Sequence, residues 1–345
     1  MHPTNGKMSN MGETRVMIRI NTSARCGILG NPSDGFFGKT IAVPARNFHA
    51  QIILFECNRI EILPGPSDHV AFNSLDDLIA DLKINGYYGG FRLIKAAIKQ
   101  FHDYVKLNGI NLEDKQFTIR YTSNIPRQVG LAGSSAIITS TIKALANFYG
   151  ITIEKPVMAN YVLWSETKEL GISAGLQDRV VQVYDEPIFM DFDEDYMKEH
   201  GYGKYGTMDP NAFPPMYLAY KINLTHKATA HNDVRKQWLN GDEKVRRVMQ
   251  EIAANAQKGY DALLKDDQEG FKACIDKNFD LRASIYSIAV ENLEMIKLAR
   301  SIGATAKFPG SGGAIIGTFS DDQMLETLKR EFSKLNCDVV RLTLI

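Results

Sequence analysis

Hydrophobic positions along the chain follow two periods, one typical of strands and one typical of helices. Residues 41–57 are rich in β-branched and aromatic residues, which favours strands. Residues 91–107 and 136–150 carry apolar residues at helical spacing, with Gly109 and Gly150 as stops. The same patterns predict strands within 15–29 and at 117–126, 180–184, 216–222, 314–319 and 339–345, and helices at 157–170, 245–264 and around 271–285.

These strands and helices alternate irregularly, which favours an α+β protein in two lobes over a single parallel sheet. A length of 345 residues also suggests about two domains. Residues 201–215 are dense in glycine and proline and are the candidate boundary. We therefore predict an N-terminal lobe at 1–205, which begins with a loose polar tail at 1–14, and a C-terminal lobe at 206–345.

Charge and composition narrow the classes of protein to which this chain could belong. Lys and Arg number 40, as do Asp and Glu, so the electrostatic case for a nucleic-acid or membrane-surface binder is absent. No run of about 18 apolar residues predicts a membrane-spanning helix, and the polar N-terminus lacks the apolar stretch of a signal peptide. Four scattered cysteines without a CxxC pair fit a reducing compartment. We expect a cytoplasmic protein without nucleic-acid or membrane partners.

A cluster of small residues at 126–137 joins a predicted strand to a predicted helix. Backbone N–H groups at a helix start lack intrahelical partners and, with the helix dipole, attract anions. Gly130 and Gly133 would let a phosphate approach the backbone, and the hydroxyls of Ser134 and Ser135 could bind phosphate or Mg²⁺. The other interpretation is an ordinary helix capped by serine. The residues alone leave both open.

Two further glycine clusters need separate interpretations. Residues 307–317 place three glycines before an apolar strand, where they could admit a ligand or another backbone, or simply form a hairpin turn. Gly38, Lys39 and Thr40 resemble the end of a Walker A loop. That motif requires a glycine where this chain has Ser33, and it requires a following helix where we predict a strand. We therefore do not expect a P-loop.

Three segments together resemble the GHMP kinases, the superfamily of galactokinase, homoserine kinase, mevalonate kinase and phosphomevalonate kinase. These are ARCGILGNPSD at 24–34, PRQVGLAGSSA at 126–136 and KFPGSGGA at 307–314, in the order and approximate spacing of that superfamily. The resemblance spans almost the whole chain. It implies a two-lobed α+β fold with an N-terminal lobe like ribosomal protein S5 domain 2 and a ferredoxin-like C-terminal lobe.

Within the superfamily, the segments at 30–40, 86–90, 169–184 and 307–314 are most similar to glucuronokinases. The resemblance implies an ATP- and Mg²⁺-dependent kinase that converts glucuronate to its 1-phosphate by phosphorylating the anomeric hydroxyl. Another sugar, heptose or mevalonate-type kinase is the rival enzyme, and a non-catalytic ligand sensor of the same fold is the rival from another class. The partners would be ATP and a small sugar, and the chain would be a monomer or a homodimer.

The resemblance also assigns the chemistry to particular residues. Asp178 matches the catalytic carboxylate that accepts the hydroxyl proton, and Arg25 matches the basic residue beside it. Without the resemblance, these two would be an acidic residue in a turn and an arginine at a strand end. Glu166 lies twelve residues before Asp178 and would bind Mg²⁺ with Ser135, while Glu169 is a rival ligand.

Nucleotide and substrate residues follow from the same matches. The expected nucleotide-binding residues are Pro126, Arg127, Gly130, Leu131, Ala132, Gly133, Ser134, Ser135 and Ala136. The expected substrate-binding residues are Asp34, Tyr87, Gly89, Arg179, Gly310 and Gly312. An acidic sugar also predicts an arginine that binds its carboxylate through two N–H groups. Arg127, Arg179 and Arg282 are the candidates, and the sequence does not choose among them.

Overall fold

A computed structural model of the chain describes residues 17–63, 90–222 and 234–345. Six of the described strands form the larger sheet: β1 (Met17–Leu29), β2 (Lys39–Cys57), β3 (Glu61–Leu63), β4 (Gln116–Ser123), β5 (Ile188–Asp191) and β6 (Lys204–Thr207). Their order is β3-β4-β2-β5-β6, and β1 pairs antiparallel with β2 along nearly its whole length. β2 holds the sheet together, because its two ends pair with different strands, β4 and β5.

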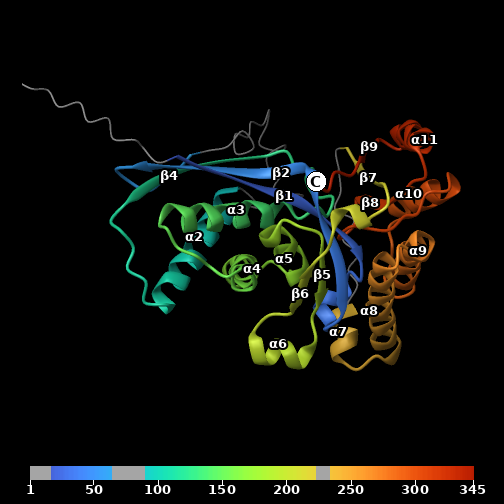
Figure 1. The fold of residues 1–345 in the computed structure, drawn as a ribbon, viewed down its shortest axis with the longest axis horizontal. Coiled ribbons are helices and arrows are strands. Elements are labelled where there is room, and N and C mark those ends of the chain that lie inside the picture. Colours follow the sequence, from blue (N-terminus) through green and yellow to red (C-terminus); the bar gives the residue numbers. More distant parts are fainter. Residues whose placement is uncertain (1–16, 64–89, 223–233) are drawn as a thin grey trace, which may run out of the picture.

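Four helices pack on one face of this sheet: α2 (Gly90–Leu107), α3 (Gly133–Phe148), α4 (Lys155–Trp164) and α5 (Leu176–Tyr184). Figure 1 shows them below β1, β2 and β4. The buried residues of α2 include Leu93, Ala97, Phe101 and Val105, whose spacing of four places them on one face. α3 is buried almost all round because it lies between the sheet and the other helices. A π-helical turn, η3 (Ser165–Glu169), continues α4.

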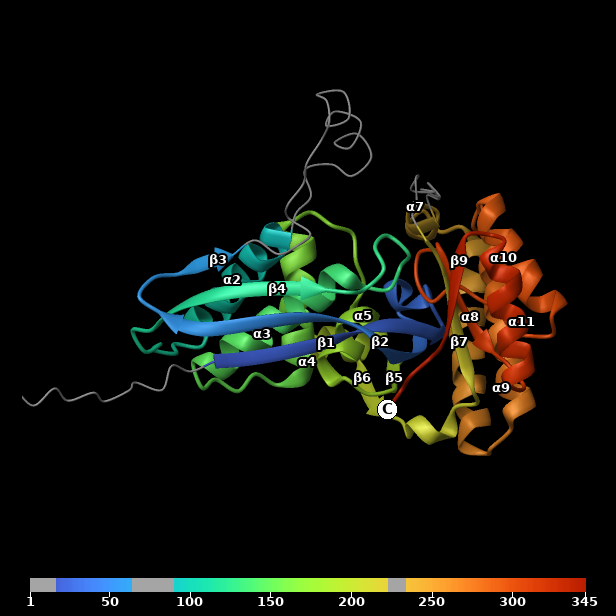
Figure 2. The ribbon, with the colours of Figure 1, turned by 90° about the horizontal axis from the view of Figure 1, so that it is seen from above.

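The smaller sheet has β7 (Met216–Lys221) between β8 (Ala314–Thr318) and β9 (Cys337–Arg341), all antiparallel. Figure 2 shows this part of the molecule beside one end of the β1–β2 hairpin. Its principal helices are α8 (Glu243–Leu264), α9 (Gln268–Ala283), α10 (Val290–Ser301) and α11 (Asp322–Ser333). The short elements are η1 (Ser33–Phe36), α6 (Glu194–His200), η4 (Pro210–Ala212) and α7 (Val234–Leu239).

The predicted α+β class is confirmed, and most predicted elements lie within a few residues of their positions. One prediction is wrong: residues 180–184 are part of α5 and do not form a strand. Val180, Val181 and Val183 are buried there, and burial in α5 overrides the strand preference of valine. A strand, β2, follows Gly38 as expected, which does not suit a P-loop. The lobe division at 205/206 stays a prediction, and the change of sheet occurs between β6 and β7.

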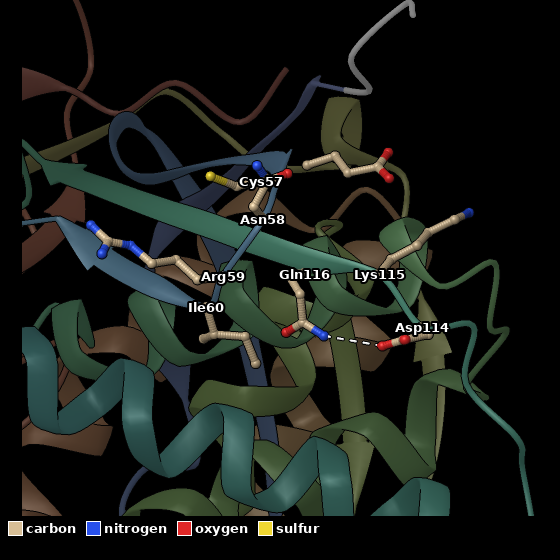
Figure 3. Close-up of a pocket in the computed structure, with 8 residues that line it drawn as sticks. Cys57, Asn58, Arg59, Ile60, Asp114, Lys115 and Gln116 are labelled. Carbon is tan, nitrogen blue, oxygen red and sulfur yellow. Dashed lines mark hydrogen bonds between the residues drawn. The ribbon is translucent and has the colours of Figure 1, made fainter.

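Some of the earlier predictions concern segments outside the described residues, among them the tail at 1–14. In the described part of the chain, no helix combines the length and apolarity needed to cross a membrane. The four cysteines are free thiols, and Cys26, Cys274 and Cys337 are buried. A shallow pocket adjoins the partly buried Cys57 at the turn after β2 (Figure 3). Cys57 is thirteen positions along β2 from Pro44, the residue that pairs with Arg25, so the pocket lies roughly 40 Å from Arg25.

Candidate active site

Arg25 and Asp178 form a two-bonded ion pair at the centre of the three sequence motifs. Asp178 stands in the first turn of α5, where the helix dipole favours a negative charge. Arg25 comes from the buried half of β1, and its Nε and Nη2 each lie 2.5 Å from a carboxylate oxygen of Asp178. Its Nη1 donates to the carbonyls of Gly130 at 3.0 Å and Pro309 at 2.8 Å. One guanidinium therefore touches residues from both glycine clusters and the predicted base.

The ionisation of Asp178 follows from its two arginine neighbours. Burial by itself raises the pKa of Asp178, but the charges of Arg25 and Arg179 outweigh it and hold the pKa below its usual value. Arg179 Nη1 lies 3.3 Å from the Asp178 carboxylate. The side chain of Asp178 remains 18% exposed, so it is an ionised acceptor that a ligand can reach.

Arg179 also pairs with Glu166, and this second ion pair is almost completely buried. Arg179 Nε donates to Glu166 Oε2 at 2.8 Å, its Nη2 approaches the same oxygen, and its Nη1 donates to the Gly175 carbonyl at 2.9 Å. The rival residue Glu169 accepts a hydrogen bond from Gln100 of α2 at 2.6 Å. The structure therefore joins Glu166 to the Asp178 network and turns Glu169 toward α2.

Asp34 adds a second carboxylate to the site. It lies in η1, and its carboxylate is so close to Gly175 that any Cβ there would overlap it. The backbone N–H of Gln177 in α5 donates to it. Burial, and then the nearby charge of Asp178, raise the pKa of Asp34 to about 6 against the opposing effect of Arg25 and Arg179. Asp34 and Asp178 therefore influence each other's charge within one site.

The second and third glycine clusters meet backbone to backbone. Gly130 has φ +71°, and a Cβ on it would lie 2.7 Å from the Ser311 amide nitrogen. A Cβ on Gly310 would overlap the Gly130 carbonyl. Gly310 thus admits another backbone, one of the alternatives the sequence left open. α3 begins at Gly133, directly after Ala132 in the left-handed region. Arg25 contacts the loop just before this start, because its side chain donates to the Gly130 carbonyl and its backbone N–H donates to the Leu131 carbonyl.

Sequence reasoning missed two buried residues that hold the first motif in place. Lys307 Nζ donates to the carbonyls of Gly27 at 2.7 Å and Phe308 at 2.8 Å and to the Asn31 side chain. Asn278 of α9 accepts from the Gly30 amide at 2.6 Å. A lysine inside an otherwise apolar, glycine-rich segment was the available signal for Lys307. Nothing in the sequence marked Asn278, because its partner is 248 residues away.

The remaining residues expected in the site differ in how exposed they are, and two of them lie outside the described residues. Arg127, in the second motif, is exposed, whereas Leu131 and Ser135 of the same motif are buried. Ser135 Oγ donates to the Ala132 carbonyl at 3.1 Å. Gly312 has φ +125° and lies close to Asn292 of α10. Tyr87 and Gly89 lie outside the described residues. An ionised carboxylate beside a glycine-flanked helix start suits transfer of a phosphoryl group to a hydroxyl.

Comparisons with known proteins agree with this chemistry. Residues 92–186 match the family of GHMP kinases N terminal domains. The chain is 46% identical to probable glucuronokinase 2 of Arabidopsis thaliana over 90% of this chain and 87% of the relative. It is 42% identical to glucuronokinase 1 of the same plant, over 90% and 88%. Galactokinase of Lactococcus lactis, solved with galactose, superposes with a TM-score of 0.77 over 97% of this chain and 95% of that one, at 14% identity, and shows the shared fold.

Proposed function

The chain belongs to the GHMP kinases, and from this premise we propose that it transfers the γ-phosphoryl group of ATP to the anomeric hydroxyl of glucuronate. The products are the sugar 1-phosphate and ADP. The observation that carries the proposal is the Arg25–Asp178 pair beside the start of α3. The two Arabidopsis relatives, whose names say glucuronokinase, support the choice of sugar.

Asp178 acts as the general base. As the anomeric oxygen attacks the γ-phosphorus, the bond from that phosphorus to the β–γ bridging oxygen breaks and the hydroxyl proton passes to the Asp178 carboxylate. A base with a lowered pKa is ionised throughout the neutral range, so it is always ready to accept. In the loose transition state of phosphoryl transfer the proton moves late, and a strong base is unnecessary.

Arg25 and the start of α3 supply the positive electrostatic field. Arg25 cannot give up a proton, so its charge persists while charge develops on the attacking oxygen. The N-terminus of α3, preceded by Gly130 and Ala132 in left-handed conformations, would receive the phosphates of ATP. Both features neutralise charge in a region partly shielded from water, where such interactions are strongest.

Glu166 and Ser135 fit a magnesium ion by their chemistry. Mg²⁺ prefers a carboxylate, a hydroxyl and phosphate oxygens and keeps its remaining waters. Both Arg179 donors converge on Oε2 of Glu166, so Oε1 is the oxygen that would bind the cation. When bound, Mg²⁺ would neutralise charge on the triphosphate. Arg179 meanwhile holds Glu166 and Asp178 in one network.

Replacing Asp178 with asparagine tests the base directly. Asp178→Asn keeps the shape of the side chain but removes its charge, so kcat should fall about 10²–10⁴-fold. ATP affinity, measured by calorimetry, should change little because Asp178 faces the acceptor. Asp185→Asn at the C-terminal end of the same helix, where Asp185 pairs with Arg46 at 2.8 Å, is the matched control and should keep its kcat. An Asp178→Asn enzyme with more than about a third of wild-type kcat contradicts the role.

Kinetics with a panel of acceptor sugars test which sugar is the substrate. The kcat/KM for glucuronate should exceed that for glucose or galactose by about 10²-fold or more. In a site built to bind a carboxylate, a buried guanidinium has no partner when a neutral sugar is bound. Proton NMR should show the reducing-end signals disappearing as the 1-phosphate forms. A preference for a neutral hexose, a heptose 7-phosphate or mevalonate would replace the substrate assignment. Absence of ATP turnover with every acceptor would favour a ligand sensor.

A further inference from the structure

We propose that Arg282 binds the carboxylate of the acceptor sugar and thereby selects glucuronate over neutral sugars. This inference rests on the proposed function. It identifies one of the three arginines that the sequence left as equal candidates. The contacts of the other two separate them from Arg282.

Arg179 and Arg127 differ from Arg282 in what surrounds them. The guanidinium of Arg179 is fully engaged, because it binds Glu166 through two nitrogens and contacts Asp178 and the Gly175 carbonyl through the third. A sugar carboxylate would have to displace those partners. Arg127 is exposed to water, where an ion pair contributes little to binding or selectivity.

Arg282 is buried, and one of its donor atoms has no partner among the described residues. It lies in the last turn of α9 and is only 9% exposed. Its Nη1 donates to the Gly310 carbonyl at 2.8 Å, while its Nε is buried and has no hydrogen-bond partner among the described residues. Buried polar groups are normally hydrogen-bonded, so an unpartnered guanidinium nitrogen indicates a missing acceptor. The Nε edge of an arginine is suited to two parallel bonds with a carboxylate.

The charge of Arg282 also lacks a counterion. Among the ion pairs of the described residues, none includes Arg282, although buried arginines are usually paired. Its planar face lies over the rings of Tyr286, at 5.3 Å, and Phe308, at 5.4 Å. These rings fix the guanidinium but do not neutralise it. Burial lowers the pKa of Arg282, and Tyr286 and then Asp34 oppose this effect.

Arg282 and the Arg25–Asp178 pair both reach the third motif, at consecutive carbonyls. Arg282 donates to the carbonyl of Gly310, and Arg25, the partner of Asp178, donates to the preceding carbonyl, that of Pro309. The acid end of a sugar at Arg282 would therefore lie near its reacting hydroxyl at Asp178. The C-terminal dipole of α9 does not explain where the Arg282 guanidinium lies. Its Nη1 donates to the Gly310 carbonyl of the third motif and not to the last carbonyls of α9.

The test compares two acceptors in one variant. Arg282→Gln should lower kcat/KM for glucuronate about 10²-fold, leave kcat/KM for glucose within about threefold, and leave the KM for ATP unchanged. Arg282→Lys keeps the charge without the two parallel donors, so its kcat/KM for glucuronate should lie between those of the wild type and Arg282→Gln. Arg300→Gln is the matched control, since Arg300 packs on Phe279 of α9 but pairs with Asp276 and Asp280. It should keep the wild-type ratio between the sugars.

Glucuronate binding by calorimetry gives a second readout, and thermal melting confirms that each variant folds. A wild-type enzyme that does not prefer glucuronate contradicts the proposed function itself. Suppose that the wild type prefers glucuronate. If Arg282→Gln then keeps the wild-type ratio of kcat/KM between glucuronate and glucose, even with both values lowered equally, the assignment of Arg282 is overturned and the proposed function stands. A raised KM for ATP with both sugars would assign Arg282 to the nucleotide phosphates instead. If both Arg282 variants fail to fold, Arg282 is a structural residue and the assignment fails.

Discussion

At the scale of single residues, arginine at position 25 does what a lysine could not. Its fork makes two bonds to Asp178 and leaves Nη1 for the carbonyls of Gly130 and Pro309. A lysine is a compact point charge with no planar fork. The same side chain therefore sets the ionisation of the base and aligns the two glycine clusters around it.

Replacing Arg25 with lysine should separate these two effects. Arg25→Lys keeps a positive charge near Asp178 but loses the bonds that align the carboxylate, so kcat should fall about 10-fold to 10²-fold while the protein stays folded. Steady-state kinetics and a thermal melt measure the two quantities. A kcat equal to wild type would show that charge alone is sufficient at this position.

Asp34 predicts a pH dependence. An ionised carboxylate accepts hydrogen bonds from sugar hydroxyls through both oxygens, whereas a protonated carboxyl group donates through one of them. The pKa of Asp34 is raised to about 6, chiefly by burial. Deprotonation therefore occurs as pH rises through that value, and kcat/KM for the sugar should increase between about pH 5 and 7. The Asp34→Asn variant should have a lower kcat/KM without this rise. A rise that persists in Asp34→Asn would assign the ionisation to another group.

At the scale of elements, the junction between the strand β4 and the helix α3 is shaped by its neighbours. The loop turns through left-handed residues at Gln128, Gly130 and Ala132 before α3 begins. The third glycine cluster lies against Gly130 and leaves no room for a side chain there. Gly133 differs, because a Cβ on it would be 3.5 Å from Ile125, an ordinary contact. A substitution at Gly133 therefore tests phosphate binding without requiring a rearranged loop.

Gly133→Val should weaken ATP binding at least about tenfold, because the added methyl groups would stand where a phosphate approaches the helix start. Calorimetry measures the affinity, and circular dichroism checks the fold. Gly206→Val in β6 is the control, since a Cβ at Gly206 has no neighbour within 4 Å. Unchanged ATP affinity in a folded Gly133→Val protein would remove the phosphate-binding role of this loop.

At the scale of the whole molecule, buried polar contacts join the two parts of the chain. Lys307 follows α10 in sequence, yet its Nζ binds the carbonyl of Gly27 in β1 and the side chain of Asn31. Burial lowers the pKa of Lys307 well below its usual value. Three oxygen acceptors take up its three donors, which is the arrangement that a buried ammonium needs.

Lys307→Met should destabilise the protein by about 3 kcal/mol, because it leaves buried oxygens of Gly27, Asn31 and Phe308 without their donor. Urea unfolding measures the free energy. Lys334→Met on the exposed end of α11 is the control and should change it by less than about 0.5 kcal/mol. A Lys307→Met protein as stable as wild type would mean that packing alone joins the two parts.

The sequence by itself determined the family, the α+β class and most elements. The glycines at 130 and 310 were visible in clusters because glycine is the residue that permits such close approaches. Their order along the chain identified the GHMP kinases, which the family match and the relatives confirm. The amphipathic spacing of α2 predicted its bounds within one residue. The roles assigned to Asp178, Glu166 and Ser135 remain predictions.

Only the tertiary structure decided which charges face one another. Residues 166 and 169 are equally acidic in the sequence, but the π turn directs Glu166 to Arg179 and Glu169 to Gln100. The valines of α5 favour a strand locally and become helical because they are buried in the core. Three arginines were equal candidates for the sugar carboxylate, and burial with an unpartnered Nε distinguishes Arg282. Such differences arise from contacts between distant segments, and neither periodicity nor composition contains them.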